Sequence, residues 1–344
     1  MTASRVPVLG ITMGDPAGVG PEIIAKAIAR PEVAASCRPV VIGDRSVMAA
    51  TLALLRSPLT LHAVTSVEHC AFEPGHLECL DLANVDAASL PRATVSAQAG
   101  RAAYAYIEAG VRLCQAGTID GIVTAPVNKE ALAAAGVQHS GHTEILARLT
   151  GTKDFAMLLM GKELRVIHVT THVALRRVPD LVTRERVGRV IRLAQRTMQG
   201  LGRPRARIAV CGLNPHAGED GLFGDEEKTA ITPAVEDARR DGLDVHGPLP
   251  ADTLFSRARG GEFDIVVAMY HDQGHVPVKT LGFNYDEATG TWTGLSGVNV
   301  TVGLPFLRVS VDHGTAFDRA WKGIANPESM IEAIDVAVRM LGKA

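Results

Sequence analysis

Residues 8–22 read VLGITMGDPAGVGPE, a short apolar run followed directly by a glycine-rich loop. The run Val8–Thr12 is rich in β-branched residues and predicts a strand, and Pro21 suits the first turn of a helix. A strand that leads through such a loop into a helix N-terminus commonly binds an anion. The spacing is not G-x-G-x-x-G and no Walker A motif occurs. The loop is therefore either another kind of ligand contact or a plain structural turn.

Short apolar runs alternate with helical patterns along the rest of the chain. Further runs without polar alternation occur at residues 39–43, 121–124, 207–211 and 263–268. Such runs are typical of strands covered on both faces, as in an α/β fold with a mostly parallel sheet. The length of 344 residues suggests about two domains. Because no linker is visible, we expect residues 1–344 to form one enzyme chain of two interwoven α/β lobes.

The composition excludes several classes of protein. The net charge of −2 argues against a protein that binds the nucleic-acid backbone, and an aromatic content of 4% argues against base stacking. No apolar stretch approaches the roughly 20 residues of a membrane span, and no secretory segment is visible at the N-terminus. The five cysteines form no C-x-x-C pair, as expected for reduced thiols. We expect a cytoplasmic protein that binds neither nucleic acid nor membrane.

Histidines follow several of the predicted strands. His168 and His172 follow one apolar run, His216 follows a second and His271 follows a third. Loops at the carboxyl ends of strands collect catalytic groups in α/β folds. Three imidazoles from three such loops would suit a divalent metal with open coordination positions. Each histidine is alternatively a hydrogen-bonded polar residue that holds no ligand.

Carboxylates and candidate anion-binding groups accompany these histidines. Asp252 and Asp272 are the nearby carboxylates. The groups suited to an anionic substrate are His142, Thr143, Lys279, Asn299 and Arg308. Arginine binds a phosphate through two parallel hydrogen bonds, lysine supplies a point charge, and threonine or histidine adds hydrogen bonds. Taken singly, each is alternatively a surface charge or a helix cap.

With these motifs assembled, the chain resembles the 4-hydroxythreonine-4-phosphate dehydrogenases of pyridoxal phosphate synthesis over essentially its whole length. Eight blocks in the same order carry the resemblance: residues 14–22, 124–129, 141–144, 170–172, 213–219, 247–253, 270–274 and 310–316. It implies a divalent metal (zinc, magnesium or cobalt) held by His172, His216 and His271. It implies substrate contacts from His142, Thr143, Lys279, Asn299 and Arg308. It also implies a homodimer whose active sites lie near the subunit interface.

A wider resemblance accounts for the missing dinucleotide fingerprint. Residues 14–22, 313–316 and 323–327 look like the corresponding loops of isopropylmalate and isocitrate dehydrogenases, which bind NAD or NADP through a non-Rossmann loop. This implies a two-lobed α/β fold with the active site in the cleft between the lobes. The implied cofactor-binding residues are Gly14, Asp15, His313, Gly314, Thr315, Ala316 and Asn326. The alternative for these loops is a plain turn with helix caps.

Two departures from the family pattern flank the expected substrate contacts. The connection from Lys279 to Asn299 is longer than usual, and its part Phe283–Gly297 carries glycines at 290, 294 and 297 that predict a hairpin or turn. Residues 275–278, His-Val-Pro-Val, replace more apolar residues. Both point to relatives that act on threonate or erythronate 4-phosphate, or on diol acids. We expect the long segment to tune substrate choice. The alternative is an exposed hairpin or a dimer contact.

The implied reaction is the metal-dependent oxidation of a secondary alcohol β to a carboxylate by NAD or NADP, followed by loss of CO2. The expected substrate is 4-hydroxythreonine 4-phosphate or a close 4-phosphorylated hydroxy acid. Lys279 is either a base or a phosphate-binding group, and Asp252 and Asp272 are further catalytic candidates. Two other classes stay open: a metal-dependent hydrolase, which three histidines would also permit, and a non-catalytic binding protein on the same fold.

Overall fold

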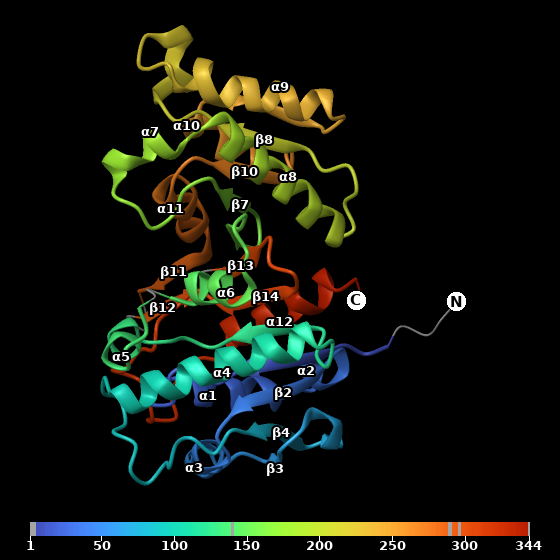
Figure 1. Cartoon of the computed structure of the whole chain (residues 1–344), viewed down its shortest axis with the longest axis vertical. Helices are drawn as coiled ribbons and strands as arrows, with labels where there is room; N and C mark the ends of the chain where they lie inside the picture. The colour runs from blue at the N-terminus through green and yellow to red at the C-terminus, as the bar shows by residue number, and fades with distance from the viewer. Residues whose placement is uncertain (1–4, 139–140, 288–290, 295–296, 343–344) are drawn as a thin grey trace. The chain divides into compact units, whose positions relative to one another are not determined.

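A computed structural model describes residues 5–138, 141–287, 291–294 and 297–342. The chain divides into two compact units (Figure 1). Unit 1 comprises Met1–Lys153 and Leu304–Ala344, and unit 2 comprises Asp154–Gly303. Both units combine strands with helices, so the predicted α/β class is confirmed.

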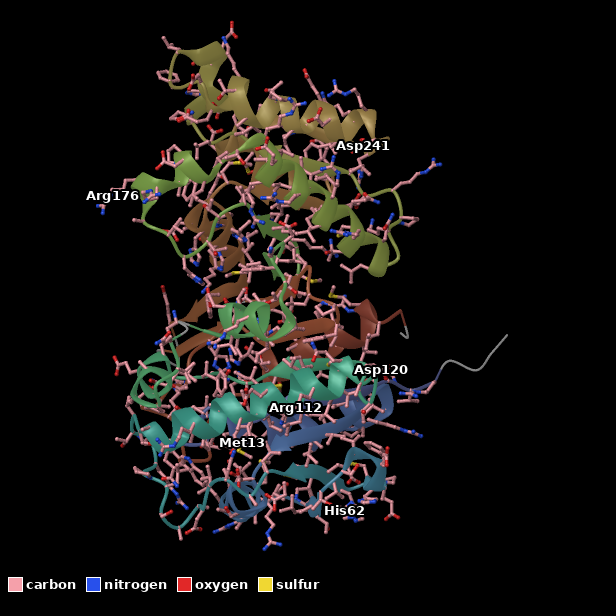
Figure 2. All side chains as sticks on the ribbon, in the orientation of Figure 1. Met13, His62, Arg112, Asp120, Arg176 and Asp241 are labelled. Carbon is pink, nitrogen blue, oxygen red and sulfur yellow. The ribbon has the colours of Figure 1, made fainter. Side chains whose placement is uncertain are left out.

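Unit 1 contains a parallel sheet. Its strands are β1 (Val8–Thr12), β2 (Arg38–Gly43), β3 (Thr60–Val64), β4 (His76–Asp81), β5 (Gly121–Thr124) and β14 (Leu307–Val311). They are ordered β3-β4-β2-β1-β5-β14, and every neighbouring pair is parallel. All five residues of β1 are buried, as its apolar sequence predicts. Asp120, which is labelled in Figure 2, lies directly before β5. Its carboxylate accepts from the backbone nitrogen of Val8 at 2.8 Å, which ties the start of β1 to the start of β5.

The helices of unit 1 form two groups around this sheet. They are α1 (Gly20–Ile28), α2 (Pro31–Ser36), α3 (Arg45–Leu55), α4 (Ala97–Gln115), α5 (Lys129–Ala134), α6 (His142–Thr150) and α12 (Glu328–Met340), with a short 3₁₀ turn at Val67–His69. Helix α4 packs against β1, β2 and β5 and contacts α5 and α6, whereas α1 packs with α2, α3 and α12 (Figure 1). The Ser96 side chain caps α4 by accepting from the Ala99 nitrogen at 3.1 Å.

Unit 2 has a mixed sheet. Its strands are β6 (Ala156–Met160), β7 (Arg165–His168), β8 (Ile208–Cys211), β9 (Val245–Leu249), β10 (Ile265–Ala268) and β13 (Val298–Val302). The order is β13-β6-β7-β10-β8-β9, in which β6 runs antiparallel to β13 and β7 and the other pairs are parallel. Within these two strand orders, only the pairs that involve β6 are antiparallel among the described strands, so the predicted mostly parallel sheet is confirmed.

The helical segments of unit 2 connect these strands. They are the turns η2 (Leu175–Arg177), η3 (Pro215–Gly221) and η4 (Glu227–Ile231), and the helices α7 (Val178–Leu181), α8 (Arg184–Gly200), α9 (Thr232–Arg240), α10 (Ala251–Arg259) and α11 (His271–Gly282). The buried face of α8 includes Val187, Ile191 and Met198, at the spacing of an amphipathic helix. Within the described part of the chain, no helix is long and apolar enough to cross a membrane.

The long connection after α11 forms a hairpin. Strands β11 (Phe283–Asp286) and β12 (Thr291–Gly294) pair antiparallel, with Phe283 opposite Gly294 and Asp286 opposite Thr291. The predicted hairpin is therefore confirmed for its two strands, and Gly290 lies outside the described residues. All five cysteines are free, as expected for reduced thiols.

Candidate active site

The glycine-rich loop of residues 14–22 contacts the loop after β14 within unit 1. The Val19 nitrogen donates to the Thr315 carbonyl at 3.0 Å. A Cβ on Gly18 would lie only 3.0 Å from the same carbonyl, so a larger residue would force the two loops apart. Gly14 has a φ of +72°, and a Cβ there would collide with the Pro126 carbonyl. The structure thus brings together the two loops that were predicted to bind the cofactor.

Buried carboxylates line the first of these loops. Asp15 is 1% exposed, and burial raises the pKa of its carboxyl from 3.8 to about 6, although the Ala17 nitrogen donates to it at 2.9 Å. The second Asp15 oxygen and both Glu22 oxygens have no hydrogen-bond partner among the described residues. Unsatisfied buried acceptors are costly, so these oxygens suit hydrogen-bond donors of a ligand such as hydroxyl groups.

The other predicted cofactor residues lie in two segments of unit 1, the loop after β14 and the segment that leads to α12. The Lys26 ammonium donates to the Gly323 and Ala325 carbonyls at 2.9 and 2.6 Å and fixes the segment that leads to α12. The Asn326 side chain accepts from the Glu328 nitrogen at 3.0 Å and caps that helix. His313, Gly314, Thr315 and Ala316 lie on the loop after β14. A cofactor role for all of them stays a prediction.

Arg308 is the centre of a second group in unit 1. It lies on β14 beside β5 and is 4% exposed, and its guanidinium donates to the Thr124 hydroxyl at 2.7 Å. Burial lowers its pKa from 12.5 to about 9, opposed by the negative charge of Glu144. The guanidinium is therefore still charged at neutral pH. A buried cation of this kind favours an anionic ligand.

His142 and Thr143 begin α6 near this guanidinium. Burial lowers the pKa of His142 well below 6.5, and the charge of Arg308 lowers it further. The His142 Nε2 atom is buried without a hydrogen-bond partner in the described residues. We call Arg308, Thr124, His142 and Thr143 the unit 1 anion site. Thr124 was not among the predicted site residues, although it opens the block at residues 124–129.

Two of the three predicted metal ligands lie close together in unit 2. His172 follows β7 and His271 begins α11, and their ring centroids are 5.5 Å apart. The His271 Nδ1 atom is 2.6 Å from the Asp272 carboxylate, and this hydrogen bond lowers the pKa of Asp272. Because the ionised carboxylate only accepts, Nδ1 carries a proton, and in a neutral imidazole of this tautomer Nε2 has the lone pair. A carboxylate that orients a histidine in this way is typical of metal sites.

His216 is not placed with these two histidines. It lies in the η3 turn, where residues 216–220 all have positive φ, and its ring contacts Phe223 at a centroid distance of 6.2 Å. Among the described residues, no group of three or more His, Cys, Asp or Glu side chains is arranged to hold a metal ion. The structure therefore brings together His172 and His271, and the three-histidine site stays a prediction.

Two polar side chains, buried Glu227 and half-buried Gln273, fix the loops that carry His216 and His271. The Glu227 carboxylate accepts from the backbone nitrogens of Leu213 and Asn214 at 2.7 and 2.8 Å, just before His216. The Gln273 side chain accepts from the Met269 nitrogen at 2.7 Å and donates to the Gly212 carbonyl at 2.8 Å. Gln273 thus links the start of α11 to the segment after β8. Sequence analysis did not single out either residue.

Helix α11 carries His271, His275 and Lys279 at intervals of four residues, which places them along one face of the helix. His275 is 5% exposed, and burial lowers its pKa from 6.5 to about 3, with smaller contributions from His168, His271 and Lys279. Asn299, the other predicted substrate contact of unit 2, lies on β13 opposite Leu159 of β6.

Asp252 and Asp272 line a cavity of about 580 Å³ in unit 2. Residues of α10 and α11 form it, including Phe255, Val276 and Leu281. Both aspartates are exposed, and Asp252 accepts from the Thr253 nitrogen at 2.9 Å in the first turn of α10. Asp272 is tied to His271, so its predicted role fits better with orienting that histidine than with acting as a base. Catalytic roles for both stay predictions.

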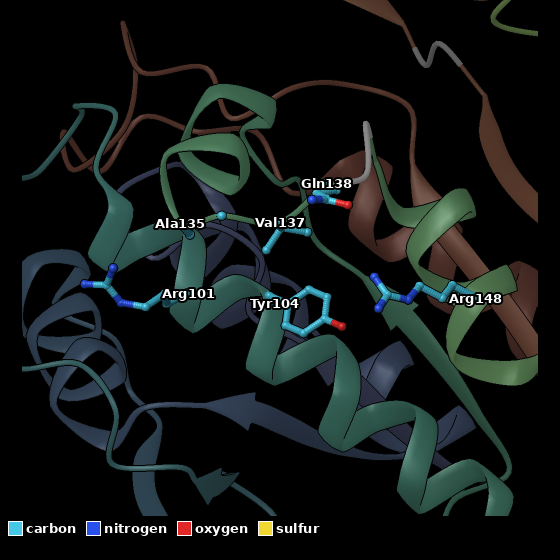
Figure 3. A pocket seen from close by; sticks show the side chains of 7 residues that line it. Arg101, Tyr104, Ala135, Val137, Gln138 and Arg148 are labelled. Atoms are coloured by element: carbon cyan, nitrogen blue, oxygen red, sulfur yellow. The ribbon is translucent and has the colours of Figure 1, made fainter.

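A separate cavity of about 440 Å³ lies in unit 1 beside the segment that precedes α6. Figure 3 shows Tyr104 of α4 between Arg101 of the same helix and Arg148 of α6. Gln138 completes its polar lining. None of the predicted site residues lines this cavity.

Comparison with known proteins identifies the family. The family of the pyridoxal phosphate biosynthetic protein PdxA matches residues 35–337. The chain belongs to this family. A PdxA-family relative from Cupriavidus necator, named D-threonate 4-phosphate dehydrogenase, is 52% identical over 96% of both chains. The crystal structure of a 4-hydroxythreonine-4-phosphate dehydrogenase from Burkholderia phymatum is 48% identical, with a TM-score of 0.84 over 98% of both chains.

A more distant solved structure belongs to a different substrate class. A terephthalate 1,2-cis-dihydrodiol dehydrogenase from Burkholderia xenovorans is 32% identical over 97% of this chain and 98% of that chain, with a TM-score of 0.68. The predicted family is thus confirmed, and so is the resemblance to it along nearly the whole length of the chain.

Proposed function

We propose that this PdxA-family protein is a dehydrogenase that oxidises D-threonate 4-phosphate at the alcohol β to the carboxylate. NAD or NADP takes up the hydride, and the resulting β-keto acid loses CO2 to leave a three-carbon ketone phosphate. The observation that carries this proposal is the 52% identity, over 96% of both chains, to a relative named for that activity. The predicted class of enzyme, an oxidoreductase, agrees with the names of the relatives.

The unit 1 anion site supplies a place for the phosphate group. Arg308 is charged and buried, and it already donates to Thr124 at 2.7 Å. The unpartnered Nε2 of His142 adds a further polar atom. Guanidinium groups bind phosphate oxygens through strong, charge-assisted hydrogen bonds. This arrangement supports a phosphorylated acid over the terephthalate 1,2-cis-dihydrodiol for which the Burkholderia xenovorans relative is named.

His172 and His271 would hold the divalent metal. The donor set fits, because the two imidazoles lie together and Asp272 fixes the Nδ1 proton of His271, leaving Nε2 for the ion. A bound metal would lower the pKa of the substrate alcohol and stabilise the negative charge that develops on its oxygen. His216 remains the proposed third ligand. In the predicted homodimer, the active sites lie near the subunit interface. A second copy of the chain would then be close enough to contribute residues to the site.

Lys279 is our candidate for accepting the alcohol proton. It lies two helical turns after His271 on the same face of α11. Only the neutral amine accepts a proton, so this role requires Lys279 to be deprotonated in the reacting complex. Its alternative role is to bind the phosphate. Replacing Lys279 by Met separates the two roles, because loss of a base lowers kcat whereas loss of a phosphate contact raises KM.

The second candidate substrate is 4-hydroxythreonine 4-phosphate, favoured by the 48% identical structure described as a dehydrogenase of that compound. Steady-state formation of reduced nicotinamide, measured with D-threonate, D-erythronate and 4-hydroxythreonine 4-phosphates and with unphosphorylated D-threonate, tests the proposal. We expect the highest kcat/KM with D-threonate 4-phosphate. A higher kcat/KM with 4-hydroxythreonine 4-phosphate would overturn this assignment. Equal values for D-threonate and its phosphate would overturn the role of the anion site.

A further inference from the structure

His275 occupies a central position on α11 that the proposed reaction does not use. It lies one turn after His271 and one turn before Lys279, and it is only 5% exposed. Its ring stacks on His271, with centroids 3.7 Å apart and an angle of 7° between the planes. It also belongs to the His-Val-Pro-Val stretch in which the sequence departs from the family pattern. A buried polar ring at such a place needs a hydrogen-bond partner.

His168 supplies that partner, and the hydrogen bonds assign the proton positions of both rings. The His168 Nδ1 atom is 3.1 Å from the Met157 carbonyl, which can only accept, so Nδ1 carries the hydrogen. The Nε2 atom of a neutral imidazole then has a lone pair. It lies 3.2 Å from His275 Nδ1, which must therefore be the donor. The same Nδ1–H lies 3.1 Å from the His271 carbonyl.

The backbone of α11 is shaped to admit His168. A Cβ on Gly274 would collide with His168 Nε2 and lie 2.7 Å from a methyl group of Val166. Only glycine at this position lets the His168 ring approach the helix closely enough to reach His275. The pair is thus anchored on β6 through Met157, on β7 through His168 and on α11 through Gly274.

We propose that the His168–His275 pair positions His271 for metal binding. Asp272 holds His271 through Nδ1, and the stacked ring of His275 holds one face of the same imidazole. His168 acts only through His275, because its own ring centroid is 6.4 Å from that of His271. Both are positioning residues in this proposal. It rests on the metal site of the proposed function.

Metal binding to the purified full-length protein tests the pair directly. His168→Leu removes the His168 acceptor of His275 Nδ1 without changing the ring stacked on His271, and it leaves the His271 carbonyl as the other acceptor. We expect this variant to bind Co²⁺ about 10- to 100-fold more weakly in calorimetric titrations, as for other residues that orient a metal ligand. We also expect a changed visible spectrum of the Co²⁺ complex. His168→Gln offers a side-chain oxygen to His275 Nδ1 and is expected to restore most of the affinity.

His246→Leu is a matched control, because His246 is an exposed histidine of unit 2 on β9. It is expected to leave the Co²⁺ affinity unchanged. The double variant His168→Leu/His275→Leu is expected to bind no more weakly than the weaker of the two single variants, because both break the same contact.

Unchanged Co²⁺ affinity in folded His168→Leu and His275→Leu variants would overturn the proposal and leave the proposed function intact. Failure of the wild-type protein to bind Co²⁺ at all would instead refute the metal site of the proposed function. The two outcomes are therefore distinguishable.

Discussion

Replacing Arg308 by lysine keeps a cation in the unit 1 anion site but removes the planar guanidinium. Arg308 is 4% exposed and donates to Thr124 at 2.7 Å, so its geometry is fixed before a ligand arrives. Lysine cannot form two parallel hydrogen bonds to a phosphate. The loss of one charge-assisted hydrogen bond costs about 1.5–3 kcal/mol. We therefore expect Arg308→Lys to raise KM for D-threonate 4-phosphate about 10- to 100-fold.

Burial also makes the effect of this substitution depend on pH. It lowers the pKa of Arg308 from 12.5 to about 9, so the wild-type guanidinium stays charged near neutral pH. An ordinary lysine titrates near 10.4, below arginine, and the same burial would lower the pKa of the introduced amine. The amine would therefore lose its charge at a lower pH than the guanidinium. We expect the KM ratio of variant to wild type to increase with pH.

Steady-state kinetics at several pH values, with D-threonate 4-phosphate and with D-threonate, measure both effects. Arg101→Lys is the matched control, because Arg101 is an exposed arginine of unit 1 on α4. It is expected to leave KM unchanged. An unchanged KM in the Arg308→Lys variant, or an equal rise for the unphosphorylated acid, would refute the assignment of Arg308 to the phosphate.

Four further predictions follow from the structure and the sequence. Burial raises the pKa of Asp15 from 3.8 to about 6, so the folded protein favours the protonated carboxyl. The free energy of unfolding therefore falls as the pH rises from about 4 through about 6, because the unfolded chain ionises first. Asp15→Asn is expected to stabilise the protein at pH 7–8 by up to about 3 kcal/mol and to have no such effect near pH 4, as thermal denaturation would show. Gly274→Ala is expected to lower the free energy of unfolding by about 1–3 kcal/mol, because the added methyl group overpacks against His168 and Val166. Gly188→Ala is the control, since Gly188 also lies within a helix of unit 2 but faces only the end of an arginine side chain. It is expected to leave the free energy of unfolding unchanged or to raise it, as denaturant titrations would show. Exhaustive chelation is expected to abolish reduction of the nicotinamide, and activity that survives it would contradict a metal-dependent reaction. Shortening Phe283–Gly297 to a tight turn is expected to change the ratios of kcat/KM among 4-phosphorylated acids, and unchanged ratios in a folded protein would leave the hairpin a structural role.

The fold was largely predictable because its strands are continuous apolar runs. Residues 39–43, 121–124 and 263–268 lie in or around β2, β5 and β10, and their central residues are buried. Helix α4 begins directly after Ser96, whose side chain caps it, and a serine before an apolar pattern is a helix-start signal that is visible in the sequence. Side chains covered on both faces leave a signal in the local sequence, so no tertiary information is needed to locate such strands.

The site was only partly predictable because its contacts join distant segments. Arg308 reaches Thr124 across 184 residues, and His168 reaches His275 across 107. Periodicity carries no information on such pairs. The i, i+4 spacing of His271 and His275 was visible in the sequence and indicates that both rings share one helix face. The second departure, at residues 275–278, therefore marked a site residue whose partner only the fold reveals.

The stoichiometry of the reaction with D-threonate 4-phosphate tests the central claim most directly. Reduced nicotinamide, CO2 and inorganic phosphate are measured in one reaction of the metal-loaded protein. Our account predicts one CO2 for each nicotinamide reduced, with the phosphate retained on the three-carbon product. Release of inorganic phosphate without reduction of the nicotinamide would contradict it and indicate a metal-dependent hydrolase instead.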